Sequence, residues 1–222
     1  MPTSSPRTPK APTSYAVLGL LSVRTWTTYE LAKQVQRSLN WFWPRAERRL
    51  YDEPKQLVAH GLATATKEFT GQRPRTVYGI TDAGRAALRD WLGQPSSPRA
   101  VESEAMLKVF FSDAGNLDQL TATLEGMVSE AQERLSQLAD LAGSAEHQPA
   151  FPHRLHISAL ALRLHLDQEL TTLRWARWAQ EQVALWRDTT DPGSWDHLAQ
   201  HRELVRLAHE ALQAERGPTV AG

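Results

Sequence analysis

Two groups of arginines have the chemistry and spacing to bind DNA. Arg45, Arg48 and Arg49 lie in one predicted helix, on the side opposite its apolar residues. Arg73 and Arg75 lie in a polar segment between two predicted strands. Guanidinium groups bind phosphates and form bidentate hydrogen bonds with O6 and N7 of guanine. The pattern predicts a DNA-binding surface built from a helix and a hairpin; a solvated basic face is the alternative.

A helix-turn-helix is predicted to position the first group of arginines. Residues 14–21 predict a short buried helix, because apolar side chains dominate them. Thr27 and Glu30 have the spacing of a capping box, which begins a second helix that reaches about Arg37. A third helix is predicted over residues 44–60, where a proline occupies the first position and a glycine follows the last.

A β-hairpin is predicted to position the second group. Residues 62–69 and 76–80 are rich in β-branched and aromatic side chains, and the polar residues 70–75 between them predict a turn. Thr81 is then expected to cap a closing helix. The residues of this helix that are expected to face the core are Leu88, Trp91 and Leu92. The fold class predicted is mainly α, with an N-terminal winged helix-turn-helix that has a two-stranded wing; a plain surface ribbon is the alternative for the hairpin.

Charge is distributed unevenly along the chain. Residues 1–93 hold 14 Lys and Arg against 7 Asp and Glu, whereas residues 94–222 hold 11 against 18, so the formal charges are +7 and −7. A basic half joined to an acidic half suits a protein that meets a polyanion through one half only. A solvated imbalance with no partner would give the same numbers.

The sequence argues against several other classes of protein. It has no Cys and no apolar run long enough for a membrane helix, which predicts a cytoplasmic protein without disulfides. It lacks a Gly-rich phosphate loop, a serine elbow and an HExxH motif, so neither an enzyme nor a cofactor is expected. His197 with His201, and His153 with His156, have spacings that suit metal binding, but no third ligand lies near either pair and no metal site is expected.

Composition divides the chain into four parts. Residues 1–13, rich in Pro, Ser and Thr, predict a disordered tail, for which a basic arm in the minor groove is the alternative. Residues 14–93 are the predicted DNA-binding domain, and residues 94–102 read as a linker. Residues 103–216 are predicted to be helical throughout and to form a C-terminal helical dimerisation domain.

The helical half carries more apolar surface than one subunit should bury, above all between residues 153 and 187. A homodimer interface is the simplest use of it, and a dimer would read two half-sites about one helical turn apart. The residues expected at this interface are Leu162, Leu166, Leu170, Leu173, Leu198 and Val205. Trp175 and Trp178, one turn apart, could hold a planar aromatic effector between them, or could simply pack in the core or interface.

Several segments, in order and at regular spacing, resemble the PadR family of transcriptional regulators. These segments are SYAVLGLL at residues 14–21, TYEL at 28–31, LYDEPKQL at 50–57, RPRTVY at 73–78 and ITDAGR at 80–85. The resemblance implies a dimeric repressor that pairs through its helical C-terminal region. Its third helix and wing would contact operator DNA, with a small molecule as a possible releasing effector.

The resemblance and the arginine pattern together define the expected DNA contacts. These are Thr28, Tyr29, Trp43, Arg45, Arg48, Arg49, Tyr51, Lys55, Gln72, Arg73 and Arg75. The chain departs from the family pattern at Thr28, where Gly is usual, and at Pro54, where Leu is usual. Pro54 is expected to kink the third helix. A winged helix that has lost DNA binding and docks a protein partner is the alternative function; the groove contacts alone leave repression and activation open.

Overall fold

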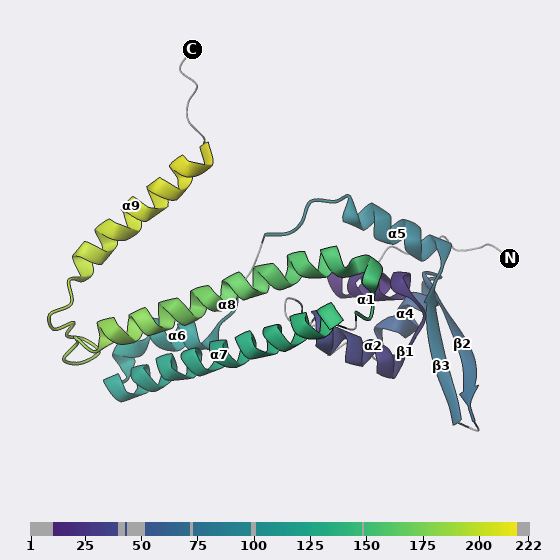
Figure 1. The fold of residues 1–222 in the computed structure, drawn as a ribbon, viewed down its shortest axis with the longest axis horizontal. Coiled ribbons are helices and arrows are strands. Elements are labelled where there is room, and N and C mark those ends of the chain that lie inside the picture. The colour runs from purple at the N-terminus through teal and green to yellow at the C-terminus, as the bar shows by residue number, and fades with distance from the viewer. Residues whose placement is uncertain are drawn as a thin grey trace, which may run out of the picture. The chain divides into compact units, whose positions relative to one another are not determined.

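The computed structural model describes residues 11–39, 43, 52–71, 73–98, 101–147 and 149–216. The chain forms two units, Met1–Arg99 and Ala100–Gly222. Helices dominate both, and the N-terminal unit adds a small antiparallel sheet (Figure 1). The predicted fold class is therefore confirmed. No described helix is long and apolar enough to cross a membrane.

The N-terminal unit contains four described α-helices and three described strands. Its elements are α1 (Pro12–Val23), β1 (Trp26–Thr27), α2 (Thr28–Gln34) with a π-helical turn η1 (Val35–Leu39), α4 (Glu53–Ala59), β2 (Ala63–Thr70), β3 (Arg73–Ile80) and α5 (Asp82–Leu92). Helix α1 begins at Pro12, so the end of the predicted tail is helical, because proline is well tolerated in a first helical turn. Residues 1–10 lie outside the described part.

Apolar side chains from the helices and the base of the sheet form the core of this unit. The most deeply buried of them are Val17, Leu18, Leu21, Leu31, Val35, Leu57 and Leu62. Helix α5 closes the unit, with the ring of Trp91 stacked on Tyr15 at a centroid distance of 4.7 Å. The prediction that Leu92 faces the core is wrong: this side chain is 68% exposed. Successive helical residues differ by about 100° in direction, so Leu92 turns away where Trp91 faces α1.

The predicted third helix lies only partly within the described residues. Helix α4 covers its C-terminal part, and residues 44–51 lie outside the description. Pro54 occupies the first turn of α4, where proline is well tolerated, and the kink predicted before it falls on residues outside the description. Glu53 is buried and accepts a hydrogen bond from the Ser14 hydroxyl of α1. Gly61 follows α4 with a φ of 72°, a left-handed conformation that favours glycine at the end of a helix.

The wing consists of β2 and β3, with β1 added to the other side of β3. The prediction that residues 70–75 form the turn is wrong, because β2 extends to Thr70 and pairs there with Arg73, where β3 already begins. Gly71 has a φ of 61°, a conformation that only this glycine adopts among the described residues of the hairpin. The short strand β1 was not predicted, and it makes the sheet three-stranded.

The C-terminal unit is built around a long antiparallel helix pair. Its elements are α6 (Glu104–Phe110), η2 (Ser112–Ala114), α7 (Leu117–His147), η3 (Pro152–Arg154), α8 (Leu155–Val183) and α9 (His197–Arg216). Helices α7 and α8 lie side by side (Figure 1) and share a core of Leu120, Leu124, Met127, Ala176 and Ala179. Helix α7 extends over 31 residues to His147.

Candidate nucleic-acid interface

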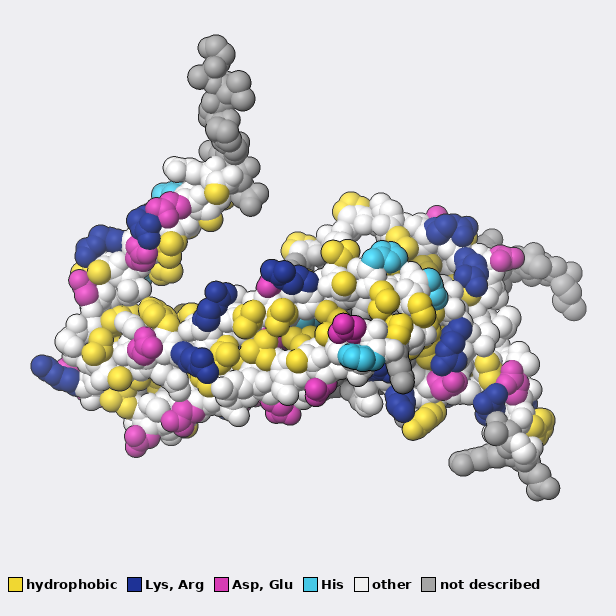
Figure 2. Space-filling model, in the orientation of Figure 1, with side chains coloured by type: hydrophobic (Ala, Val, Ile, Leu, Met, Phe, Trp, Pro, Cys, Tyr) yellow, Lys and Arg dark blue, Asp and Glu magenta, His cyan; other side chains and the backbone are white. Residues whose placement is uncertain are grey.

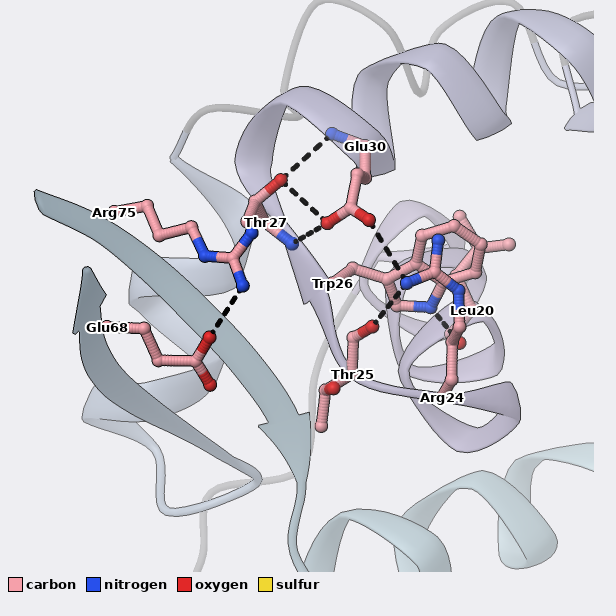
Figure 3. Close-up of polar contacts among 8 residues, drawn as sticks. All are labelled: Leu20, Arg24, Thr25, Trp26, Thr27, Glu30, Glu68 and Arg75. Carbon is pink, nitrogen blue, oxygen red and sulfur yellow. Dashed lines mark hydrogen bonds and ion pairs between the residues drawn. The ribbon is translucent and has the colours of Figure 1, made fainter. Parts of the chain in front are cut away.

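A complete capping box fixes the N-terminus of α2 (Figure 3). The Thr27 hydroxyl accepts a hydrogen bond from the backbone N–H of Glu30 at 3.2 Å, and the Glu30 carboxylate accepts one from the backbone N–H of Thr27 at 2.8 Å. The Thr27 hydroxyl also donates to this carboxylate at 2.8 Å. The predicted box is confirmed, and it satisfies two donors at the point where a helix lacks internal partners.

The same contacts lower the pKa of Glu30. The backbone N–H of Thr27 is the largest cause, burial opposes it, and the Thr27 hydroxyl and the Arg24 guanidinium act in the lowering direction. Nη1 of Arg24 lies 3.1 Å from Oε1 of Glu30. Glu30 is therefore ionised at neutral pH, and its negative charge interacts favourably with the positive end of the α2 dipole.

Arg24 and Trp26 join the end of α1 to the start of α2. The Arg24 guanidinium lies 3.6 Å from the ring centroid of Trp26, a cation–π contact. Trp26 is buried, and its indole N–H donates to the carbonyl of Leu20 at 2.7 Å. Neither residue was assigned a role from the sequence, because the contact depends on the chain reversal between the two helices. The start of α2 is thus stabilised by its own capping box and by the contacts of Arg24 and Trp26.

Strand β1 attaches α2 to the wing. Thr27 lies opposite Val77 of β3, and opposite residues of an antiparallel pair point to the same face. Side chains two residues apart on a strand also share a face, so Arg75 lies on the same face as Thr27. Figure 3 shows Arg75 on β3 next to the strand that leads into α2. The sheet therefore brings one predicted wing contact and the predicted α2 contacts into one rigid arrangement.

Tyr29 is an exposed aromatic side chain of α2. It is 75% exposed and occupies the second position of the helix, next to the half-buried Thr28. A phenolic hydroxyl donates readily to a phosphate oxygen, and such contacts set the orientation of a protein on the duplex. The geometry suits the contact that was predicted for Tyr29.

Arg75 on the wing is paired with a carboxylate. Its Nη2 lies 2.9 Å from Oε2 of Glu68, the residue directly opposite on β2 (Figure 3). The two side chains are 48% and 44% exposed. A phosphate that approaches Arg75 must therefore compete with Glu68, a partner that the sequence prediction did not include.

Trp43, which was predicted to contact DNA, is hydrogen-bonded to helix α1. Its indole N–H donates to the Thr13 hydroxyl of α1 at 3.1 Å. Thr13 is buried, so this bond ties the chain after η1 back onto α1. The only hydrogen-bond donor of the Trp43 ring is then engaged within the protein, and its polar contact with DNA is not supported by the geometry.

Several of the predicted DNA contacts lie outside the described residues. These are Arg45, Arg48, Arg49, Tyr51 and Gln72, together with the side chain of Arg73. Lys55 is described: it is exposed on α4, with Nζ 3.4 Å from Oδ1 of Asp52. Among the described residues, Tyr29, Lys55 and Arg75 are exposed and Thr28 is half-buried.

The residues predicted for subunit pairing and effector binding lie on α8 and α9. Leu162 and Leu173 are half-buried, whereas Leu166, Leu170, Leu198 and Val205 are exposed. Trp175 packs against the α7–α8 core, and Trp178 is 39% exposed. The two tryptophans therefore differ in accessibility, and Trp178 is the one a ligand would reach.

The described histidines and carboxylates do not gather into a metal site. No group of three or more of them in the described part of the chain could hold an ion. Nδ1 of His201 is hydrogen-bonded to the carbonyl of His197 at 2.8 Å, a contact within one helical turn. The second histidine pair, His153 and His156, spans the junction of η3 and α8.

Comparison with known proteins gives two family matches. Residues 17–90 match the transcriptional regulator PadR-like family, and residues 101–184 match the family described as virulence activator alpha C-term. The negative transcriptional regulator PadR of Bacillus subtilis (strain 168) is 29% identical over 170 residues, which cover 72% of this chain and 91% of that protein. Helix α9 lies beyond both matched ranges.

Solved structures give the same result. The crystal structure of Bacillus subtilis PadR in complex with operator DNA has a TM-score of 0.68 and 25% identity, covering 78% of this chain and 99% of that one. The same protein in complex with p-coumaric acid has a TM-score of 0.60 and 25% identity, with the same coverage. Both units of the chain are therefore represented among proteins of known structure.

Proposed function

The chain is a transcriptional regulator of the PadR-like family and not an enzyme, and we propose that it binds operator DNA as a homodimeric repressor. The observation that carries the proposal is the attachment of α2 to the wing. Strand β1 and the Thr27–Glu30 capping box fix exposed Tyr29 relative to Arg75. A fixed spacing between a helix contact and a wing contact is what recognition of a regular duplex needs.

Repression, as opposed to activation, rests on the relative. The Bacillus subtilis protein is named a negative regulator, and its structure contains operator DNA. We assign residues 14–93 to DNA binding, residues 94–102 to a linker and residues 103–216 to dimerisation and effector binding. The formal charge of +7 over residues 1–93 supports this division, because phosphate contacts supply much of the affinity for DNA.

The interface of the proposed dimer lies on α8 and α9. Leu166 and Leu170 on α8, and Leu198 and Val205 on α9, expose apolar side chains that no described residue covers fully. Figure 2 shows hydrophobic side chains at the surface along the α7–α8 pair. A two-fold symmetric pair would bury them and would present two wings to two half-sites.

The proposed effector is a small planar aromatic molecule bound at Trp178, with Trp175 behind it. The complex of Bacillus subtilis PadR with p-coumaric acid supports this class of ligand. Titration of the full chain with p-coumaric acid should quench tryptophan fluorescence, and W178A should abolish most of the quenching. Equal quenching in both proteins would place the ligand elsewhere.

The test of DNA binding is fluorescence anisotropy with labelled duplexes over a range of salt concentrations. One duplex comes from the region upstream of the protein's own gene, and the control is a scrambled version. A preference of about a thousandfold with a steep salt dependence would support an autoregulating operator binder. Equal weak binding to both duplexes would indicate that the operator lies elsewhere in the genome. No binding at low salt would overturn the proposal.

A further inference from the structure

The far end of the wing carries an exposed apolar pair. Phe69 on β2 is 69% exposed and lies directly opposite Pro74 on β3, one residue pair before the turn. Pro74 is also exposed. Figure 1 shows the two strands extending well past the helices at their base. Neither side chain is part of the described core, so the pair remains available to an external partner.

Cations flank this pair on both faces of the hairpin. Lys67 is exposed and lies on the same face as Phe69, because side chains two residues apart on a strand share a face. Arg75 lies on the opposite face, beside Glu68. An apolar tip with a cation on either side is complementary to a groove that has an apolar sugar wall and phosphates along both edges.

We propose that Phe69 and Pro74 form an apolar wedge that packs into the minor groove of the bound DNA. The inference rests on the proposed DNA-binding function and adds a residue that determines specificity. The backbones of paired strands lie about 4.8 Å apart, so the whole ribbon is too thick for a minor groove about 6 Å wide, and only side chains such as those of Phe69 and Pro74 can enter it. Apolar side chains of Phe and Pro are known to serve as minor-groove wedges.

The wedge predicts a preference that charge alone would not give. In the minor groove, a G·C pair presents the N2 amino group of guanine as a donor, and an A·T pair presents only acceptors. The ring of Phe69 has no acceptor to satisfy this donor and would displace its water. The tip should therefore disfavour G·C. Inosine lacks the N2 amino group, so an I·C pair should bind as A·T does.

The experiment measures this preference on a DNA site chosen by the protein itself. The full chain selects duplexes from a random-sequence library, and hydroxyl-radical footprinting locates the minor-groove segment that it protects. Base pairs in that segment are then replaced by G·C or by I·C, and Kd is measured by anisotropy. The wild type should bind the I·C duplex about tenfold more tightly than the G·C duplex, as expected for a contact of this size.

Two substitutions of Phe69 test whether its side chain causes the preference for the I·C duplex over the G·C duplex. F69A should bind the I·C duplex about tenfold more weakly than the wild type and should no longer distinguish it from the G·C duplex. F69L, which keeps an apolar side chain, should retain most of the affinity and the discrimination. Because the side chain is exposed, both variants should melt at the wild-type temperature.

Matched controls separate the wedge from general electrostatics. K67Q should make the salt dependence shallower and leave the I·C to G·C ratio unchanged. F110A removes an exposed aromatic ring of α6, in the other unit, and should change neither quantity. An F69A protein with the wild-type ratio would overturn the wedge and leave the proposed function intact. A wild-type chain that enriches no duplex would overturn both.

Discussion

Replacing Glu68 by Gln is expected to strengthen DNA binding. The Glu68 carboxylate holds the Arg75 guanidinium at 2.9 Å, with both side chains about half exposed. Exposed pairs of this kind contribute roughly 0.2 to 1 kcal/mol, and this amount is given up when Arg75 turns to a phosphate. Because about 1.4 kcal/mol corresponds to a tenfold change in Kd, E68Q should tighten binding by about 1.4-fold to 5-fold.

The salt dependence gives an independent measure of the same change. If Arg75 gains one phosphate contact, the slope of log K against log salt should become steeper by about 0.9. Across a fourfold rise in salt, from about 50 to about 200 mM, the variant should therefore lose about 3.5-fold more affinity than the wild type. Anisotropy titrations at four salt concentrations would measure both the affinity and the slope.

A second ion pair provides the control. Glu104 and Lys108 in α6 are also 2.9 Å apart, but they belong to the other unit, so E104Q should leave the affinity and the slope unchanged. An E68Q protein with unchanged or weaker binding and an unaltered slope would refute the reasoning. Glu68 would then act by orienting Arg75 for its contact, and not by competing with the phosphate.

Three further predictions concern stability and assembly. G84A should lower the free energy of unfolding by about 3 kcal/mol, because its Cβ would lie 2.1 Å from a backbone carbonyl oxygen. G126A, whose Cβ would meet nothing within 4 Å in α7, should raise this free energy by up to about 1 kcal/mol, and urea unfolding measures both. E30Q should cost roughly 0.5 kcal/mol at neutral pH. Because folding lowers the pKa of Glu30 from about 4.3, its contribution is present above that pH and fades as the pH falls through the folded-state pKa. Wild type and E30Q should thus converge in acid, and a constant difference would contradict this. Polar replacement of Leu166 and Leu173 together should give monomers in sedimentation velocity, whereas persistent dimers would place the interface elsewhere.

Local hydrogen-bonding signals in the sequence were sufficient to predict the starts of α2 and α5. The cap of α2 joins Thr27 to Glu30, and the cap of α5 joins Thr81 to Gly84, with the N–H of Gly84 donating to the Thr81 hydroxyl at 3.0 Å. Both contacts span three residues, so the residue types alone specify them. The fold class followed from these starts and from the β-branched and aromatic residues of β2 and β3.

Features that depend on distant partners were not predictable in the same way. Strand β1 has only two residues, which is too short for any periodicity, and it exists because Trp26 and Thr27 pair with residues 77 and 78 of β3. The burial of Glu53 depends on Ser14 of α1, 39 residues earlier. A pattern read along the chain carries no information about such contacts.

The partner of Arg75 could have been found from the turn. A two-residue turn at Gly71 and Gln72 sets the register, which then places Glu68 opposite Arg75. The wider turn predicted over residues 70–75 removed Arg75 from the strand and hid this pairing. The turn was therefore predicted too long, and this local error changed the interpretation of the site.

Internal ion pairs make the count of basic residues a poor guide to DNA affinity. Residues 1–93 contain 14 Lys and Arg, and 14 phosphate contacts would give a slope near about −13. Arg24, Lys55 and Arg75, however, each lie within 3.4 Å of a carboxylate oxygen. Arg24 is also stacked on Trp26 and bonded to the cap of α2, so moving it to a phosphate would cost both of these contacts. The measured slope should be clearly shallower than the cation count implies. Non-specific binding should then be weak, and affinity for an operator must depend on contacts that only the correct sequence and groove shape provide.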